Sequence, residues 1–193
     1  MKVLLLFSHP VESSFGAAVH ETARAALVAA GHDVDDCDLY AEGFDPVMSR
    51  RDRLTYHDHP ENMELVADYC HRLDRAEALV IVTPIWNYGF PAILKGYFDR
   101  VWLPGVSFDL VDGKLKSRLH HIRKVAACFT YGGTALRTFL AGDPPGKIVK
   151  RVIRAQIHPR GSCRLLPLYD MNNNTHETRV RYLETVARAM AAL

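Results

Sequence analysis

Cysteine is scarce in this sequence, and its four copies lie far apart. Cys37, Cys70, Cys128 and Cys163 form no pair separated by only two residues. Disulfide frameworks and structural zinc sites are recognised by closely spaced cysteines, so we expect neither. Isolated cysteines within strand or helix patterns usually fill the core.

Long hydrophobic runs are also missing. The longest apolar stretches, such as residues 3–7 and 78–82, are far shorter than the roughly 20 residues that cross a bilayer. The first stretch also lacks the cleavage-site pattern of a signal peptide. We therefore expect no membrane span and a cytoplasmic location.

Charge of one sign does not dominate. The chain has 24 lysine and arginine residues against 22 aspartate and glutamate residues, a formal charge of +2, and no long basic run. Without a clustered basic face, nucleic acid is not an expected partner. The 193 residues, 48% of them hydrophobic, have room for one folded domain of ordinary composition. We expect a single domain over residues 1–193.

The sequence does contain a regular alternation of short β-branched runs with amphipathic segments. Residues 78–83 (ALVIVT) are apolar on both faces, which is typical of a central parallel strand. Residues 40–60 are polar and irregular, and we interpret them as a long surface connection. The pattern predicts strands at residues 3–7, 32–39, 78–83, 125–130 and 163–169, and helices at residues 14–30, 63–73, 91–102, 148–157 and 180–190. Such alternation predicts an α/β, doubly wound, three-layer domain with a parallel sheet.

Three loops after the predicted strands are chemically distinctive. They are residues 8–15 (SHPVESSF), 84–91 (PIWNYGFP) and 131–134 (YGGT). In open α/β sheets, ligands bind beyond the carboxyl ends of the strands, where the strand order reverses. In the strand order 2-1-3-4-5 the first, third and fourth strands are neighbours, so these loops would line one crevice.

Together these loops suit a planar ring with a phosphate tail. The first loop offers hydroxyls and helix N-terminal amides, but neither arginine nor lysine, so hydroxyls and amides would bind the phosphate. The second loop combines Trp86, Tyr88 and Phe90 with Asn87 and Gly89, and the third has two glycines whose amides allow close approach. A flavin nucleotide fits this description.

Each loop also has a structural explanation. Ser13 and Ser14 could be helix N-caps, and His9 could make a local hydrogen bond. The aromatic residues of the second loop could belong to the core, and Gly132 and Gly133 could form a turn. The functional interpretation therefore depends on the coincidence of three loops.

Other motifs are incomplete. No G-x-G-x-x-G follows a strand, so the dinucleotide-binding fingerprint is missing. The segment GDPPGK at 142–147 is one residue short of a Walker loop and lacks a Ser or Thr after its lysine. The histidines at 57–59 and 120–121 have no consistently spaced third ligand, so we expect no metal site.

Four segments distributed over residues 1–133 are distinctive: SHPVESSF at 8–15, LYAEGFDPVMSRRD at 39–52, TPIWNYGFPAILKGYFDRVW at 83–102 and FTYGG at 129–133. In these segments the chain resembles the flavodoxin-fold NAD(P)H:quinone oxidoreductases. The resemblance implies a flavodoxin-like three-layer sandwich with a five-stranded parallel sheet of order 2-1-3-4-5. It also implies a bound flavin, usually FAD and in some relatives FMN, in a homodimer with the flavin ring at the subunit interface. The helix at 91–102 is an expected dimer contact.

The resemblance assigns roles to particular residues. The diphosphate region would be held by His9, Ser13, Ser14 and Phe15. The ring would be flanked by Pro84, Ile85, Trp86, Asn87 and Tyr88, and its polar edge by Thr130, Tyr131, Gly132 and Gly133. We expect Tyr131 to be a catalytic hydrogen-bond donor and the loop amides to stabilise charge at the ring edge.

The implied activity is a ping-pong transfer of two electrons as hydride, from NAD(P)H through the flavin to a quinone or similar acceptor. The sequence departs from the family at three places. Gly16 stands where the family frequently has Asn, and residues 134–140 lack the family's Tyr and His. Phe108 and Leu110 replace interface tyrosines. An electron-carrier flavodoxin or a flavin-bearing regulatory subunit is the alternative. The sequence leaves open FAD or FMN, NADH or NADPH, and the acceptor.

Overall fold

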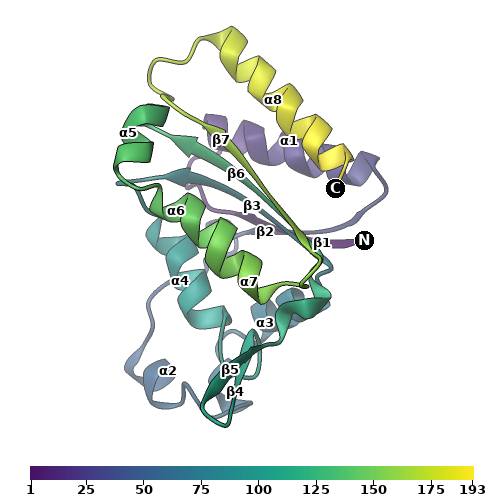
Figure 1. Cartoon of the computed structure of the whole chain (residues 1–193), viewed down its shortest axis with the longest axis vertical. Coiled ribbons are helices and arrows are strands. Elements are labelled where there is room, and N and C mark those ends of the chain that lie inside the picture. The colour runs from purple at the N-terminus through teal and green to yellow at the C-terminus, as the bar shows by residue number, and fades with distance from the viewer.

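A five-stranded parallel sheet forms the middle of three layers in the computed structural model, which describes all 193 residues (Figure 1). The strand order is β2-β1-β3-β6-β7. Counted within this sheet, that is the predicted order 2-1-3-4-5, and all four strand pairs are parallel. The strands are β1 (Lys2–Phe7), β2 (Asp33–Asp38), β3 (Ala78–Ile85), β6 (Lys124–Tyr131) and β7 (Ser162–Leu168). The predicted α/β fold is confirmed.

Burial on both faces explains why the central strands are continuous apolar runs. All eight residues of β3 are buried. In β1, Leu4 and Leu6 pack into the core on one face, whereas Val3 and Leu5 pack into the core on the other. The edge strand β2 is mostly acidic, and Cys37 is its buried residue. This gradient from centre to edge is typical of doubly wound sheets.

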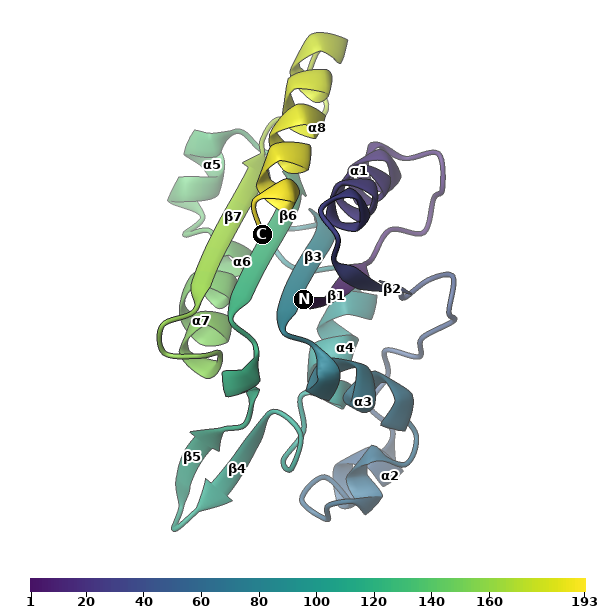
Figure 2. The same ribbon diagram turned by 90° about the vertical axis from the view of Figure 1, so that its right-hand side faces the viewer.

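Helices cover both faces of the sheet (Figure 2). On one face, α1 and α8 lie side by side and pack on one core. On the other face, α3, α4 and the helical segment after α6 pack on a second core. The helices are α1 (Phe15–Ala29), α2 (Arg50–Leu54), α3 (Ala67–Arg75), α4 (Ala92–Val101), α5 (Ala135–Leu140), α6 (Pro144–Lys147), α7 (Arg154–Gln156) and α8 (His176–Ala191), and a π-helical segment (Ile148–Ile153) joins α6 to α7. No helix combines the length and the apolar character needed to cross a bilayer.

Two predicted segments differ in the structure, and the short helix α5 was not predicted. The helix predicted at 148–157 begins earlier, at Pro144, because the Asp143 side chain caps it, and its middle is π-helical. Residues 40–60, predicted as an irregular connection, contain α2. A capping box between Ser49 and Asp52 stabilises the N-terminus of this helix. The predicted strand and helix boundaries elsewhere shift by a few residues, as frayed ends commonly do.

An antiparallel hairpin that the sequence pattern did not predict follows α4. Its strands are β4 (Phe108–Val111) and β5 (Lys114–Ser117). Asp112 and Gly113 join them with positive φ angles of 52° and 72°, the conformation that Asp-Gly favours in two-residue hairpin turns. The hairpin projects from the end of the molecule opposite α5 (Figure 1).

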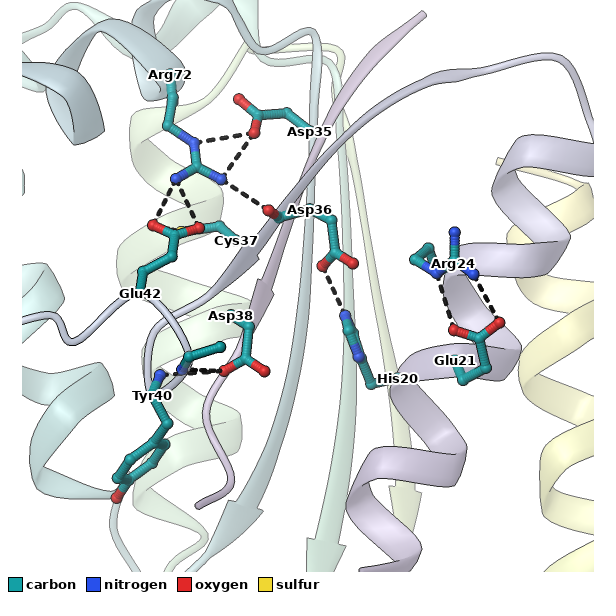
Figure 3. Close-up of polar contacts among 11 residues, drawn as sticks. His20, Glu21, Arg24, Asp35, Asp36, Cys37, Asp38, Tyr40, Glu42 and Arg72 are labelled. Carbon is teal, nitrogen blue, oxygen red and sulfur yellow. Dashed lines mark hydrogen bonds and ion pairs between the residues drawn. The ribbon is translucent and has the colours of Figure 1, made fainter. Parts of the chain in front are cut away.

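Arg72 of α3 ties the acidic edge of the sheet to the loop that follows it (Figure 3). Its guanidinium contacts Asp35 at 2.7 Å and donates to both carboxylate oxygens of Glu42 at 2.9 and 2.8 Å. It also donates to the main-chain carbonyl of Asp36 at 2.9 Å. The Asp36 carboxylate lies 2.7 Å from Nε2 of His20 on α1. Helices on both faces are thus linked to β2 through polar contacts.

Candidate active site

The three distinctive loops meet at the carboxyl edge of the sheet. Strand β3 lies between β1 and β6, and its last residue, Ile85, is in register with Tyr131. At the start of the first loop, the buried Ser8 hydroxyl donates to Thr83 of β3 at 2.7 Å. The Tyr88 hydroxyl lies 3.5 Å from where a Cβ on Gly133 would stand. The three loops therefore form one contiguous surface.

The first loop presents unpaired amides. Ser14 caps α1 by accepting a hydrogen bond from the Ala17 amide at 3.1 Å, so its structural explanation is correct. The Ser13 side chain is exposed, whereas Ser8 is fully buried and faces the sheet. The amides of Ser13, Phe15 and Gly16 donate no hydrogen bond within the chain. Free amides at the start of a 15-residue helix attract anions.

His9 connects the first loop to the second. Its Nδ1 accepts a hydrogen bond from the Val11 amide at 3.1 Å, which is the local role expected of a loop histidine. Its ring meets the edge of Trp86 at a centroid distance of 5.9 Å and an interplanar angle of 66°. His9 therefore supports the aromatic surface of the second loop.

The second loop is a tight turn that exposes two aromatic rings. The main chains of Trp86 and Gly89 exchange hydrogen bonds at 3.1 and 2.9 Å. Between them, Asn87 and Tyr88 have φ angles of 52° and 59°, the left-handed conformations of a type I′ turn. Trp86 and Tyr88 are 44% and 40% exposed, whereas the preceding Pro84 and Ile85 are buried. Non-glycine residues in this conformation are strained and concentrate at functional sites.

The third loop contains an open backbone cradle. A Cβ on Gly132 would have no atom of this chain within 4 Å, and one on Gly133 would make only ordinary contacts with Tyr88 and Thr138. Neither glycine has the positive φ that favours glycine. The amides of Gly132, Gly133 and Thr134 also donate no hydrogen bond within the chain. Packing and backbone conformation do not explain these glycines, but the close approach of a flat ligand edge does.

Tyr131 points away from the cradle into the core. Its side chain is 2% exposed, and its hydroxyl donates to Oδ1 of Asp143 at 2.8 Å. Burial, followed by the contact with Asp143, raises the pKa of Tyr131 far above its usual value. The phenol therefore stays protonated, and this bond must break before the hydroxyl donates to a ligand. Thr130, its neighbour, is half-buried.

Arg179 is a residue that the sequence reasoning missed. It comes from α8, and its guanidinium carbon lies 5.7 Å from the centre of the Phe15 ring. One guanidinium nitrogen donates to the Met171 carbonyl at 3.3 Å, whereas the buried Nε has no partner. The first loop has no cation of its own, and Arg179 places a positive charge over the ring of its last residue, Phe15.

The remaining motifs have structural roles. In GDPPGK, Asp143 caps α6 by accepting from the Gly146 amide, which explains the superficial likeness to a Walker loop. His121 lies within hydrogen-bond distance of the carbonyls of Leu73 and Arg118. No three side chains of the types that hold metal ions come together. GDPPGK and His121 therefore have local structural roles, and Asp143 also accepts the Tyr131 hydroxyl.

A family model described as a flavodoxin-like fold matches residues 1–150. The chain belongs to the flavodoxin-like fold family. The resemblance seen in the loop segments is thereby confirmed at the level of the fold.

Curated relatives of this flavodoxin-like chain are oxidoreductases by name. NAD(P)H dehydrogenase [quinone] 1 of Cavia porcellus is 29% identical over 157 residues, covering 73% of this chain and 57% of the relative. The uncharacterized NAD(P)H oxidoreductase YcaK of Escherichia coli (strain K12) is 33% identical over 127 residues, covering 65% of this chain and 63% of the relative. The chain thus spans about three fifths of the length of these relatives.

Solved structures of similar flavodoxin-like chains match over nearly their whole length. Smu.1420 from Streptococcus mutans has a TM-score of 0.84 at 27% identity, covering 100% of both chains. An NAD(P)H:quinone oxidoreductase from Methanothermobacter marburgensis has a TM-score of 0.82 at 26% identity, covering 99% of this chain and 98% of the other.

Proposed function

We propose that the chain is a flavin-dependent NAD(P)H:quinone oxidoreductase. The observation that carries this proposal is the cradle at Gly132 and Gly133, which offers free amides and open space directly beside the exposed Tyr88. The names of the relatives support the same activity. A flavin fits the site because its ring needs a flat contact surface and its polar edge needs donors.

The crevice offers a place for each part of the cofactor. The phosphate end of the cofactor would be held by the first loop, at His9, Ser13, Ser14 and Phe15, through its free amides. Arg179 would add a positive charge. Trp86, Asn87 and Tyr88 would flank the ring, with Pro84 and Ile85 supporting them from the end of β3. The polar edge of the ring would be lined by Thr130, Gly132 and Gly133, with the buried Tyr131 side chain beneath them. FAD is the favoured cofactor, and FMN also fits these residues.

The chain's own contribution to the reaction is orientation and electrostatics. A bound flavin supplies the capacity to accept and release hydride. The amides of Gly132 and Gly133 stabilise negative charge that develops at the ring edge, without a titrating side chain. Trp86 and Tyr88 hold flat substrates against the exposed face, so NAD(P)H and the quinone use the same space in turn, in ping-pong order.

A second copy of the chain would complete the site. The apolar side chains of α4, the expected contact, are largely packed inside, and its exposed residues include Lys95 and Asp99. Three strongly exposed apolar side chains lie together on α5, directly after the cradle, where Leu136, Phe139 and Leu140 are each at least 66% exposed. Contiguous apolar surface of this kind marks interfaces, so we place the homodimer contact at α5.

Purified protein is expected to show flavin absorbance, or to gain it when FAD or FMN is supplied. Chromatography of the released cofactor identifies which one is bound. With flavin, the protein should oxidise NADH or NADPH rapidly when a soluble benzoquinone is present, and a sizing column with mass detection should give twice the chain mass of 21.7 kDa. Failure to bind either flavin contradicts the proposal. Flavin binding without quinone-dependent turnover identifies an electron carrier or a regulatory subunit instead.

Replacing Arg179 by Met is expected to weaken flavin binding by roughly 10- to 150-fold, because a hydrogen bond from a charged donor contributes about 1.5–3 kcal/mol. Fluorescence titration of flavin into flavin-free protein measures the effect. Arg181→Met is the matched control, since Arg181 lies on the same helix and pairs with Glu177 at the surface. Equal affinities for the two variants would remove Arg179 from the phosphate site.

A further inference from the structure

A polar cluster lies directly beneath the glycine cradle. The Asp143 carboxylate accepts the Tyr131 hydroxyl at 2.8 Å through the same oxygen that accepts the Gly146 amide at 3.3 Å. The Asp143 amide donates to the Thr138 carbonyl at 3.0 Å. One residue therefore connects the end of β6, the end of α5 and the start of α6.

The backbone around Asp143 is shaped for this connection. Asp143 has a φ angle of 44°, a left-handed conformation that aspartate tolerates better than most residues. A Cβ on Gly146 would collide with the Asp143 carboxylate, so any larger residue there would displace the carboxylate from its present position. The chain accepts one strained residue and one obligatory glycine to keep this carboxylate in place, and strain of this kind persists where the surrounding structure enforces it.

The cradle has few other restraints. Its carbonyls are held from one side, where the Met171 amide donates to Tyr131 at 3.0 Å and the Asp170 amide donates to Gly133 at 2.9 Å. Its own amides at Gly132 and Gly133 bind nothing within the chain. The direction of those amides therefore depends on the 170–171 contacts and on how firmly the Tyr131 side chain is anchored below.

We propose that Asp143 is a positioning residue for the glycine cradle. It holds Tyr131 so that the Gly132 and Gly133 amides point at the polar edge of the flavin ring. This inference rests on the proposed function. Oriented donors stabilise developing charge only while they stay aligned, because alignment before the reaction is the source of their effect. Asp143 thus acts through Tyr131, whose buried side chain is directed to Asp143. Tyr131 becomes a positioning residue rather than a proton donor.

Three variants test the inference: Tyr131→Phe, Asp143→Ala and Asp143→Asn. Tyr131→Phe keeps the buried ring and removes the hydrogen bond, and Asp143→Asn keeps an acceptor of the same shape. Three quantities are measured for each variant. They are the flavin affinity by fluorescence titration of flavin-free protein, the reduction potential of the bound flavin, and the melting temperature of flavin-free protein. Tyr169→Phe is the matched control, since its ring lies 4.9 Å from that of Tyr131.

We expect Tyr131→Phe and Asp143→Ala each to weaken flavin binding by about tenfold, the scale of one aligned hydrogen-bond donor. A double variant that combines Tyr131→Phe with Asp143→Ala should lose no more affinity than either single variant, because both substitutions remove the same hydrogen bond. The potential should become more negative, since misaligned amides stabilise added negative charge less. Asp143→Asn should restore affinity to within about twofold, and Tyr169→Phe should stay within the same range.

The outcomes separate this inference from the proposed function. If the unmodified protein binds flavin and Tyr131→Phe binds it equally well at an unchanged potential, the positioning role is wrong and the function stands. A lower melting temperature with unchanged affinity and potential also overturns the positioning role, because Asp143 is then only a helix cap. If the unmodified protein binds no flavin, both proposals fall. Should Asp143→Ala not fold, Tyr131→Phe alone decides.

Discussion

Replacing Gly132 by Val is expected to remove most flavin binding while the protein still folds. A Cβ added at this position meets no atom of the chain within 4 Å, and the residue does not need a positive φ, so we expect the folded state to accept the substitution. The same side chain would enter the space that the ring edge needs. Overpacking costs about 1–3 kcal/mol, which corresponds to an affinity loss of roughly 5- to 150-fold.

Fluorescence titration and thermal melting, run on the same flavin-free preparation, measure the two halves of this expectation. Ala25→Val, on the exposed face of α1, is the control for adding the same kind of bulk elsewhere. Unchanged affinity in Gly132→Val would mean that no ligand approaches the cradle. Loss of folding would mean that the space beside Gly132 is needed by the chain itself.

Replacing Arg72 by Met should lower the free energy of unfolding by about 2–3 kcal/mol. Removing one partner of a buried ion pair costs about 3–5 kcal/mol, but the Asp35 and Glu42 side chains are 38% and 31% exposed and regain water when the guanidinium is gone. Methionine retains most of the apolar stem, so the loss reports the polar contacts rather than packing. Urea denaturation at neutral pH measures the change.

Arg24→Met is the matched control, because Arg24 pairs with Glu21 on the surface of α1, where such pairs contribute about 0–1 kcal/mol. If the two variants lose equal stability, the contacts drawn in Figure 3 around Arg72 are no stronger than a surface pair. Flavin affinity should not change in either variant, because neither arginine reaches the crevice loops.

The central strands could be predicted from the sequence because burial on both faces leaves an unbroken apolar run, as in β3. The hairpin β4–β5 could not, since the residues of β5 are mostly exposed and its sequence KLKS carries little apolar pattern. The Asp112-Gly113 pair was the available signal for that turn. Hydrophobic patterns therefore identify elements that pack on the core and overlook those that project from it.

The placement of the site residues shows a second limit. The strand order predicted where the loops lie, but the direction of the Tyr131 side chain was not predicted. Phe129 and Tyr131 are two residues apart in β6, so strand alternation sends both side chains into the core beneath α4. That alternation was a usable signal. Arg179 had none, because only the packing of α8 against α1 brings it to Phe15. Side chains supplied by distant helices cannot be predicted from the sequence of a single loop.

The packing of α8 on α1 sets an order of events during synthesis. The strand that carries the first loop ends at Phe7, yet the core beneath α1 includes Val186 and Met190 of α8, and the cation beside the loop is Arg179. A ribosome that has made only the first strands and helices has therefore made an incomplete anion site. Under the proposed function, flavin binding would therefore reach full affinity only after α8 has been made and docked on α1.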